Sequence, residues 1–111
     1  MDVIPVSAER TTEVLDGVHL AQAAAGERAS VQHFRIEPGA TVDRHAHENE
    51  QLGWLAAGSL VFRLDGETVT VEAGDSYAIG GGERHGAHNR GDEDAVGVEV
   101  FVPPRESPPW E

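Results

Sequence analysis

The chain of 111 residues contains no cysteine and no lysine, and it has no long hydrophobic run. Without cysteine there are no disulfides and no thiolate ligands, so a bound metal would need imidazole, carboxylate or amide ligands. No segment approaches the roughly 18 apolar residues of a membrane span. The first residues also lack the basic start and apolar segment of a signal peptide. We therefore expect a cytoplasmic protein.

Basic residues are few, and all eight are arginine, against 20 Asp and Glu. The formal net charge of −12 predicts a surface that repels nucleic acids and anionic membranes, so we expect neither as a partner. Such an acidic, lysine-free composition resembles that of proteins from salt-loving organisms. We interpret most of these acids as a solvated surface.

Helical periodicity is weak, and short alternating runs bounded by turn residues predict an all-β fold. Asp65-Gly66 between two such runs is a strong signal for a two-residue hairpin. Many short strands in a chain long enough for one domain predict a sandwich or barrel. The expected strands are 13–21, 30–36, 41–47, 51–55, 59–64, 68–72, 76–79, 85–89 and 95–102.

Three histidines and one glutamine have the spacing of a metal site. His45 and His47 are two residues apart, so on a strand they project from one face. Gln51 follows with the same parity, and His85 comes after a further strand and a glycine-rich turn. Three imidazoles and an amide oxygen suit a divalent ion. Glu50 stays open as an alternative to Gln51, because a turn before it would reset the parity.

A neutral set of ligands has electrostatic consequences. Three imidazoles and an amide leave the +2 charge of a divalent ion uncompensated, which makes it a stronger Lewis acid that favours an anionic ligand. We therefore expect a small carboxylate or an enediolate as ligand. Zinc, nickel, manganese and iron all accept this ligand set.

The last expected strand, 95–102, carries a second signal. Its one face presents four valines, which we interpret as an apolar packing surface. The other face places Glu99 between small residues and Phe101, which favours a cavity wall over an exposed edge strand with a stray charge. Two prolines then turn the chain and present Arg105.

The spacing of glycines and ligands resembles the two sequence motifs of the cupin superfamily. The first motif covers 39–58 and contains His45, His47 and Gln51; the second covers 74–89 and contains His85. The resemblance implies one cupin domain over 1–111, a jelly-roll β-barrel with a metal bound inside by these four residues. Gln51 stands at the usual glutamate position, and Gly80 at the usual proline position.

Two segments also resemble the small cupins of pectin and alginate breakdown, which convert 4,5-unsaturated monouronates to open-chain keto forms. These segments are residues 45–51, which include the glutamine ligand, and residues 100–106. In that family an acidic residue, a phenylalanine and an arginine line the site, and they fall on Glu99, Phe101 and Arg105. The resemblance implies an isomerase in which Glu99, in place of an aspartate, is general acid and base and Arg105 binds the substrate carboxylate.

Two other functions stay open, namely a metal-dependent dioxygenase and a non-enzymatic module that binds a small molecule.

Family resemblance also implies a homodimer, with Trp54 and the N-terminal segment as candidate contacts and a monomer core as the alternative for Trp54. We expect Gly53 to leave room beside the ion, and Tyr77 or Trp54 to form an apolar wall. We expect the other histidines, at positions 19, 33 and 88, to lie outside the site.

Overall fold

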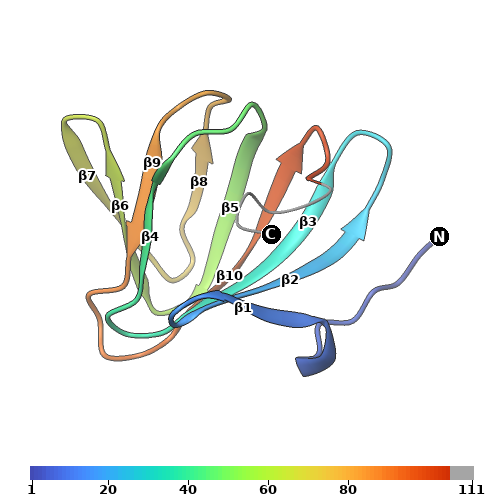
Figure 1. The fold of residues 1–111 in the computed structure, drawn as a ribbon, viewed down its shortest axis with the longest axis horizontal. Helices are drawn as coiled ribbons and strands as arrows, with labels where there is room; N and C mark the ends of the chain where they lie inside the picture. The colour runs from blue at the N-terminus through green and yellow to red at the C-terminus, as the bar shows by residue number, and fades with distance from the viewer. Residues whose placement is uncertain (106–111) are drawn as a thin grey trace.

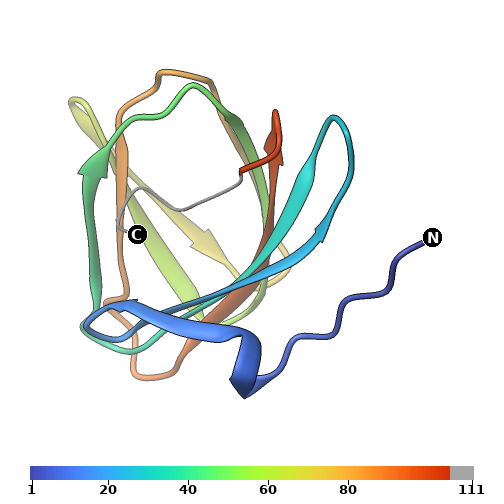
Figure 2. The ribbon, with the colours of Figure 1, turned by 45° about the vertical axis from the view of Figure 1, so that its right-hand side comes forward.

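The computed structural model describes residues 1–105, which fold into two antiparallel sheets that face each other (Figures 1 and 2). In this part of the chain a short 3₁₀ helix, Ala8–Arg10, precedes the strands. These are β1 (Thr11–Leu15), β2 (Val18–Ala25), β3 (Ser30–Ile36), β4 (Thr41–His45), β5 (Glu50–Ala57), β6 (Ser59–Leu64), β7 (Glu67–Glu72), β8 (Ser76–Ile79), β9 (His85–His88) and β10 (Ala95–Val102). No helix in the described residues has the length and apolarity that crossing a membrane requires.

The order of strands is that of a jelly roll. The larger sheet runs β1-β2-β3-β10-β5-β8 and the smaller one β4-β9-β6-β7. From β3 onward the chain passes repeatedly from one sheet to the other, interrupted by the β6–β7 hairpin, and β10 returns to lie between β3 and β5. The all-β jelly-roll prediction is confirmed.

Three neighbouring strands of the larger sheet, β3, β10 and β5, set the chemistry of the interior by their register. Gly97 of β10 lies between Phe34 and Leu55, and the Phe34 ring occupies the space where a Cβ on Gly97 would stand. Two residues further along β10, Glu99 lies between Gln32 and Gly53. The same inward face is therefore apolar at one level and polar at the next.

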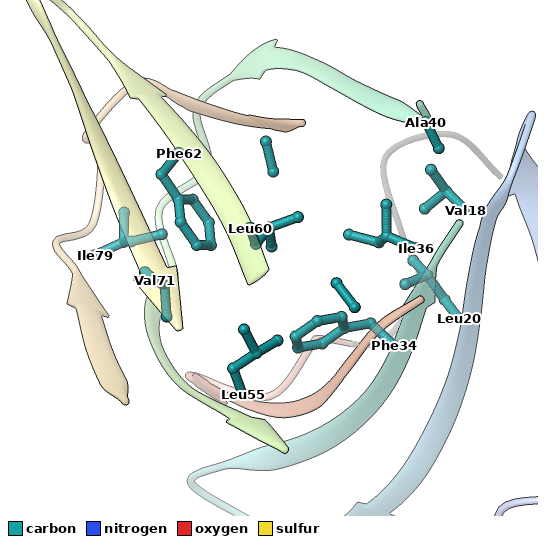
Figure 3. Packing of buried hydrophobic residues seen from close by; sticks show 12 residues of the cluster. Val18, Leu20, Phe34, Ile36, Ala40, Leu55, Leu60, Phe62, Val71 and Ile79 are labelled. Carbon is teal, nitrogen blue, oxygen red and sulfur yellow. The ribbon is translucent and has the colours of Figure 1, made fainter. Parts of the chain in front are cut away.

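The apolar level belongs to the core shown in Figure 3. Phe34, Leu55 and Leu60 are almost fully buried there, from β3, β5 and β6. Burial of each such side chain contributes about 1.5–3 kcal/mol, so this cluster is a major source of the stability that holds the two sheets together.

The predicted strands 30–36, 59–64, 76–79 and 95–102 are confirmed at both ends, and four others differ by one or two residues at one or both ends. The prediction of a single strand over 13–21 is wrong, because the chain turns at Asp16-Gly17 and forms the β1–β2 hairpin. Gly17 has a φ of +76°, a conformation that glycine adopts without strain.

The outer face of the larger sheet exposes apolar side chains. Trp54 is 48% exposed there, and Leu52, Val98 and Val102 are exposed beside it on β5 and β10. The alternative that Trp54 lies in the monomer core is therefore wrong. Its place on the outer face also means that it forms no wall of the interior cavity.

Candidate metal centre

The three histidines meet at one end of the barrel interior. His45, the last residue of β4, pairs in register with His85, the first residue of β9, and His47 lies in the loop before β5. The ring centroids of His45 and His85 are 4.6 Å apart, and those of His47 and His85 are 5.0 Å apart. One ring nitrogen from each histidine lies within 4.8 Å of the others, which is close enough for a shared ion.

Each of these rings is held by a hydrogen bond to the backbone. In every case Nδ1 lies 2.9–3.0 Å from a carbonyl oxygen two residues away: Asp43 for His45, Asn49 for His47 and Glu83 for His85. A carbonyl can only accept, so Nδ1 carries the proton and the neutral ring presents the lone pair of Nε2. Histidines that bind metals are commonly oriented in this way.

The surroundings of His47 and His85 favour the neutral form of these two rings. Burial lowers the pKa of His47, and the nearby Arg105 charge lowers it further. Burial also lowers the pKa of His85, which is only 3% exposed. Neutral imidazole is the form that binds a metal, so both rings are ready to act as ligands near neutral pH.

Gln51 supplies the observation that tests whether a cation fits. Its Oε1 lies 3.0 Å from Nε2 of His47, while its Nε2 donates to Oε1 of Glu99 at 2.7 Å. With the proton of His47 on Nδ1, the lone pairs of His47 Nε2 and Gln51 Oε1 face each other. A divalent cation bound to both atoms would satisfy both lone pairs, so these ligand atoms fit such an ion.

Glu99 is the buried carboxyl group of the site. It is 9% exposed and accepts hydrogen bonds from Gln51 at 2.7 Å, from the Tyr77 hydroxyl at 2.6 Å and from Gln32 at 3.2 Å. Burial raises the pKa of Glu99, although the hydrogen bonds from Tyr77 and Gln51 act in the opposite direction. A carboxyl group with a raised pKa, beside a candidate metal centre, is suited to proton transfer.

Tyr77 fills the space that Gly53 leaves, which corrects a prediction. An added Cβ on Gly53 would overlap the ring of Tyr77, so the missing side chain makes room for this ring and not for an ion. The ring also packs against Phe62 at a centroid distance of 4.7 Å. Burial and the neighbouring Glu99 raise the pKa of Tyr77, which keeps the hydroxyl protonated as a donor.

Phe101 and Arg105 lie together beside the histidines. The Phe101 ring is 1% exposed and lies 5.8 Å from the His47 ring. The Arg105 guanidinium carbon lies 4.4 Å from the centre of the Phe101 ring, a cation–π contact. The backbone of Arg105 is fixed as well, because its N–H donates to Ser30 Oγ and its carbonyl accepts from Gln22.

A cavity of about 50 Å³ lies among several of these groups. His45, His85, Gln51, Glu99 and Arg105 line its polar side, and core residues such as Phe34 and Leu60 line the rest. A space of this size holds an ion and a few water molecules.

Several other candidates lie away from this cavity. Glu50 is exposed, on the opposite face of β5 from the buried Gln51, so the structure does not bring it to the histidines. His88 is hydrogen bonded to Thr41, and His19 to Glu37. Gln32 is not among the predicted site residues. The signal for it in the sequence is a polar residue on the face of β3 that also carries Phe34.

Residues 32–101 match the Cupin domain family (Cupin_2), so the chain belongs to the cupins. It is similar to the H2HPP isomerase of Bacillus subtilis, with 36% identity over 67 residues that make up 60% of this chain and 28% of that protein. It is also similar to the oxalate-binding protein of Thermotoga maritima, with 32% identity over 70 residues, 62% of this chain and 58% of that protein. The match thus spans only part of each curated relative.

Among solved structures, KdgF from Halomonas sp. has a similar fold, with a TM-score of 0.84 over 96% of this chain and 97% of that one. The two sequences are 22% identical, so the likeness supports the fold alone.

Proposed function

We propose that this chain is a metal-dependent isomerase that acts on a sugar acid or a related small carboxylate, by ketonisation of the unsaturated uronate type. The observation that carries the proposal is the buried contact between Gln51, beside the three histidines, and the carboxyl group of Glu99. In this proposal Glu99 is the proton-transfer group, and it lies next to a set of neutral metal ligands. A relative named as an isomerase supports this choice.

His45, His47, His85 and Gln51 would hold the ion, with zinc, nickel, manganese and iron as candidates. When bound, it would supply Lewis-acid polarisation of the substrate oxygens. The four ligands bring no negative charge of their own. The ligand set therefore favours an anionic substrate such as a carboxylate.

Arg105 would bind the substrate carboxylate through its planar guanidinium group. Its stacking on Phe101 and its two backbone hydrogen bonds fix where that carboxylate would lie. Phe101 also forms the apolar wall next to His47. Orientation of the substrate is thus the main role of these two residues.

Glu99 would move the proton. Opening of an unsaturated uronate requires removal of the proton from its ring hemiacetal hydroxyl. A carbonyl group then forms while the ring C–O bond breaks, and the resulting enolate becomes a ketone when a proton is delivered to the former alkene carbon. One carboxyl group can do both in turn, so no proton is gained or lost overall. The raised pKa of Glu99 favours this use, because the protonated form then exists closer to neutral pH.

We further propose a homodimer that forms through the outer face of the larger sheet. Leu52, Trp54, Val98 and Val102 are exposed there, and such apolar patches commonly mark contacts between proteins. Trp54→Asp is expected to convert a dimer to a monomer in sedimentation. A native chain that sediments as a monomer would disprove this part of the proposal.

The activity is tested by adding an unsaturated monouronate to the zinc-, nickel-, manganese- or iron-loaded protein and following the loss of its ultraviolet absorbance. We expect a rate well above the spontaneous one, which Glu99→Gln abolishes while metal remains bound. A metal-loaded protein with no rate above background would refute the isomerase. Oxygen uptake by the iron form would then favour a dioxygenase.

Binding without turnover is the second candidate, because one relative is named as an oxalate-binding protein. Calorimetry with oxalate as the probe separates the two. Tight binding together with no turnover of the uronate would favour the binding module.

A further inference from the structure

The two ends of the Gln51 amide have nearly the same shape but opposite chemistry. The oxygen accepts and can bind a cation, whereas the NH₂ group donates and cannot. Rotation of the amide by half a turn would present the NH₂ group to the histidines and remove a ligand. Some neighbouring group must therefore select the orientation.

Glu99 makes this selection. Its Oε1 lies 2.7 Å from Nε2 of Gln51 and also accepts from the Tyr77 hydroxyl at 2.6 Å. A reversed amide would place two oxygens 2.7 Å apart, without a hydrogen bond and in a buried place where repulsion is poorly screened. The NH₂ group therefore faces Glu99, and the oxygen faces His47.

The selecting group is itself held from two further sides. Gln32 donates to the other oxygen of Glu99 at 3.2 Å, and both side chains are buried. The Tyr77 ring reaches Glu99 from β8, across β5, through the space above Gly53. Three strands besides that of Glu99 thus fix one carboxyl group.

We propose that Glu99 and Tyr77 are positioning residues for Gln51, holding its amide so that the oxygen faces the three imidazoles. The proposal rests on the metal centre proposed above and adds a second task for Glu99. Its Oε1 accepts from two donors at short distance, whereas within residues 1–105 Oε2 accepts only the longer hydrogen bond from Gln32. Oε2 is thereby the oxygen left for proton transfer.

The test is titration of the metal-stripped protein with Zn²⁺ in a calorimeter. Glu99→Leu removes the acceptor, and we expect zinc affinity to fall about 10- to 100-fold, as is usual for loss of a partner behind a metal ligand. The matched control Glu99→Gln keeps an acceptor oxygen for Gln51. We expect it to retain most of the affinity although it lacks the charge.

A second background makes the test specific for orientation. In Gln51→Glu both ends of residue 51 are oxygens, so no partner is needed to select one. There we expect the added Glu99→Leu change to leave zinc affinity equal or higher, because it also removes a like charge. Tyr77→Phe is expected to weaken zinc binding modestly with Gln51 and not at all with glutamate at position 51.

The outcomes separate the two proposals. If the wild-type protein binds no zinc, the metal centre and the positioning role both fall. If it binds zinc and Glu99→Leu binds equally well, or weakens equally in both backgrounds, only the positioning role is wrong. Equal losses in Glu99→Gln and Glu99→Leu would also overturn it. If Glu99→Leu does not fold by circular dichroism, the Tyr77→Phe pair decides by the same comparison.

Discussion

Residues 1–105 contain two groups of three histidine or acidic side chains. Within each group the potential ligand atoms lie within 4.8 Å of one another. The two groups differ in the partners of these side chains. The first is the histidine cluster, His45, His47 and His85. The second, the surface cluster, joins Glu13, His19 and Glu37 where the β1–β2 hairpin meets the end of β3. Proximity of the ligand-type atoms alone does not distinguish them.

The partners of the side chains do distinguish them. In the surface cluster His19 Nε2 is 2.6 Å from Glu37 Oε2, and Glu13 accepts the backbone N–H of Gly17 at 2.9 Å. Its polar atoms therefore hold one another and the turn. In the histidine cluster the backbone holds each Nδ1, and the lone pairs of the rings converge. A group of side chains is thus prepared for an ion when hydrogen bonds to residues outside the group orient its ligand atoms toward one another. A short distance between the ligand atoms is not sufficient.

Removal of one histidine is the strongest way to test this contrast. We expect His45→Ala to lower zinc affinity by more than about 100-fold, since loss of a ligand should exceed the loss of a partner behind one. His19→Ala, the matched control in the surface cluster, is expected to leave affinity and stoichiometry unchanged. Calorimetry checks both, and a bound ion lost in His19→Ala would show that the surface cluster binds metal too.

A methyl group at Gly53 should disturb the histidine cluster indirectly, through Tyr77 and Glu99. In Gly53→Ala the new Cβ would overlap the Tyr77 ring, and forced displacement in a packed interior typically costs about 1–3 kcal/mol. We expect a lower melting temperature together with weaker zinc binding, because Tyr77 would no longer reach Glu99. Gly80→Ala is the control, since the nearest atom to its Cβ is 3.6 Å away. Equal melting temperatures for the two variants would contradict the account.

Acid should weaken the metal-free protein through the same cluster. Burial lowers the pKa of His47 and His85 below the 6.5 of a free histidine, so the unfolded chain takes up protons first as the pH falls. These two histidines therefore leave the free energy of unfolding at its full value above pH 6.5, and they lower it as the pH falls below 6.5. Urea titrations at a series of pH values measure this slope, which we expect His85→Gln to reduce. An unchanged slope in that variant would show that His85 does not contribute.

Much of this site could be predicted because alternation within a strand fixes which residues share a face. Parity puts Glu99 and Phe101 on one face of their strand, and the small residues beside them favour a cavity wall; both side chains are buried. Four strands had correct bounds because turn residues closed them at both ends. The β1–β2 hairpin was missed because Asp16-Gly17 interrupts a run that otherwise looks continuous.

The network behind Gln51 could not be predicted in this way. Gln32 and Glu99 are 67 residues apart, and Tyr77 and Glu99 are 22 apart, so their contacts depend on which strands lie side by side. That order places β10 between β3 and β5, which no local pattern specifies. The role of Gly53 was misread for the same reason, because the ring that fills its space comes from the neighbouring strand, β8.

Removal of a side chain from the surface cluster should have the smallest effect on stability. Glu37→Ala removes the partner of His19, whose side chain is 14% exposed, while that of Glu37 is 45% exposed. A partly exposed contact of this kind usually contributes no more than about 1 kcal/mol, so we expect a small shift in the urea midpoint and no change in zinc binding. Glu27→Ala, in the exposed turn after β2, controls for the loss of one acidic charge. A loss of stability as large as that of Gly53→Ala would mean that the surface cluster holds the β1–β2 hairpin in place. The contribution of these three side chains would then be larger than their solvent exposure indicates.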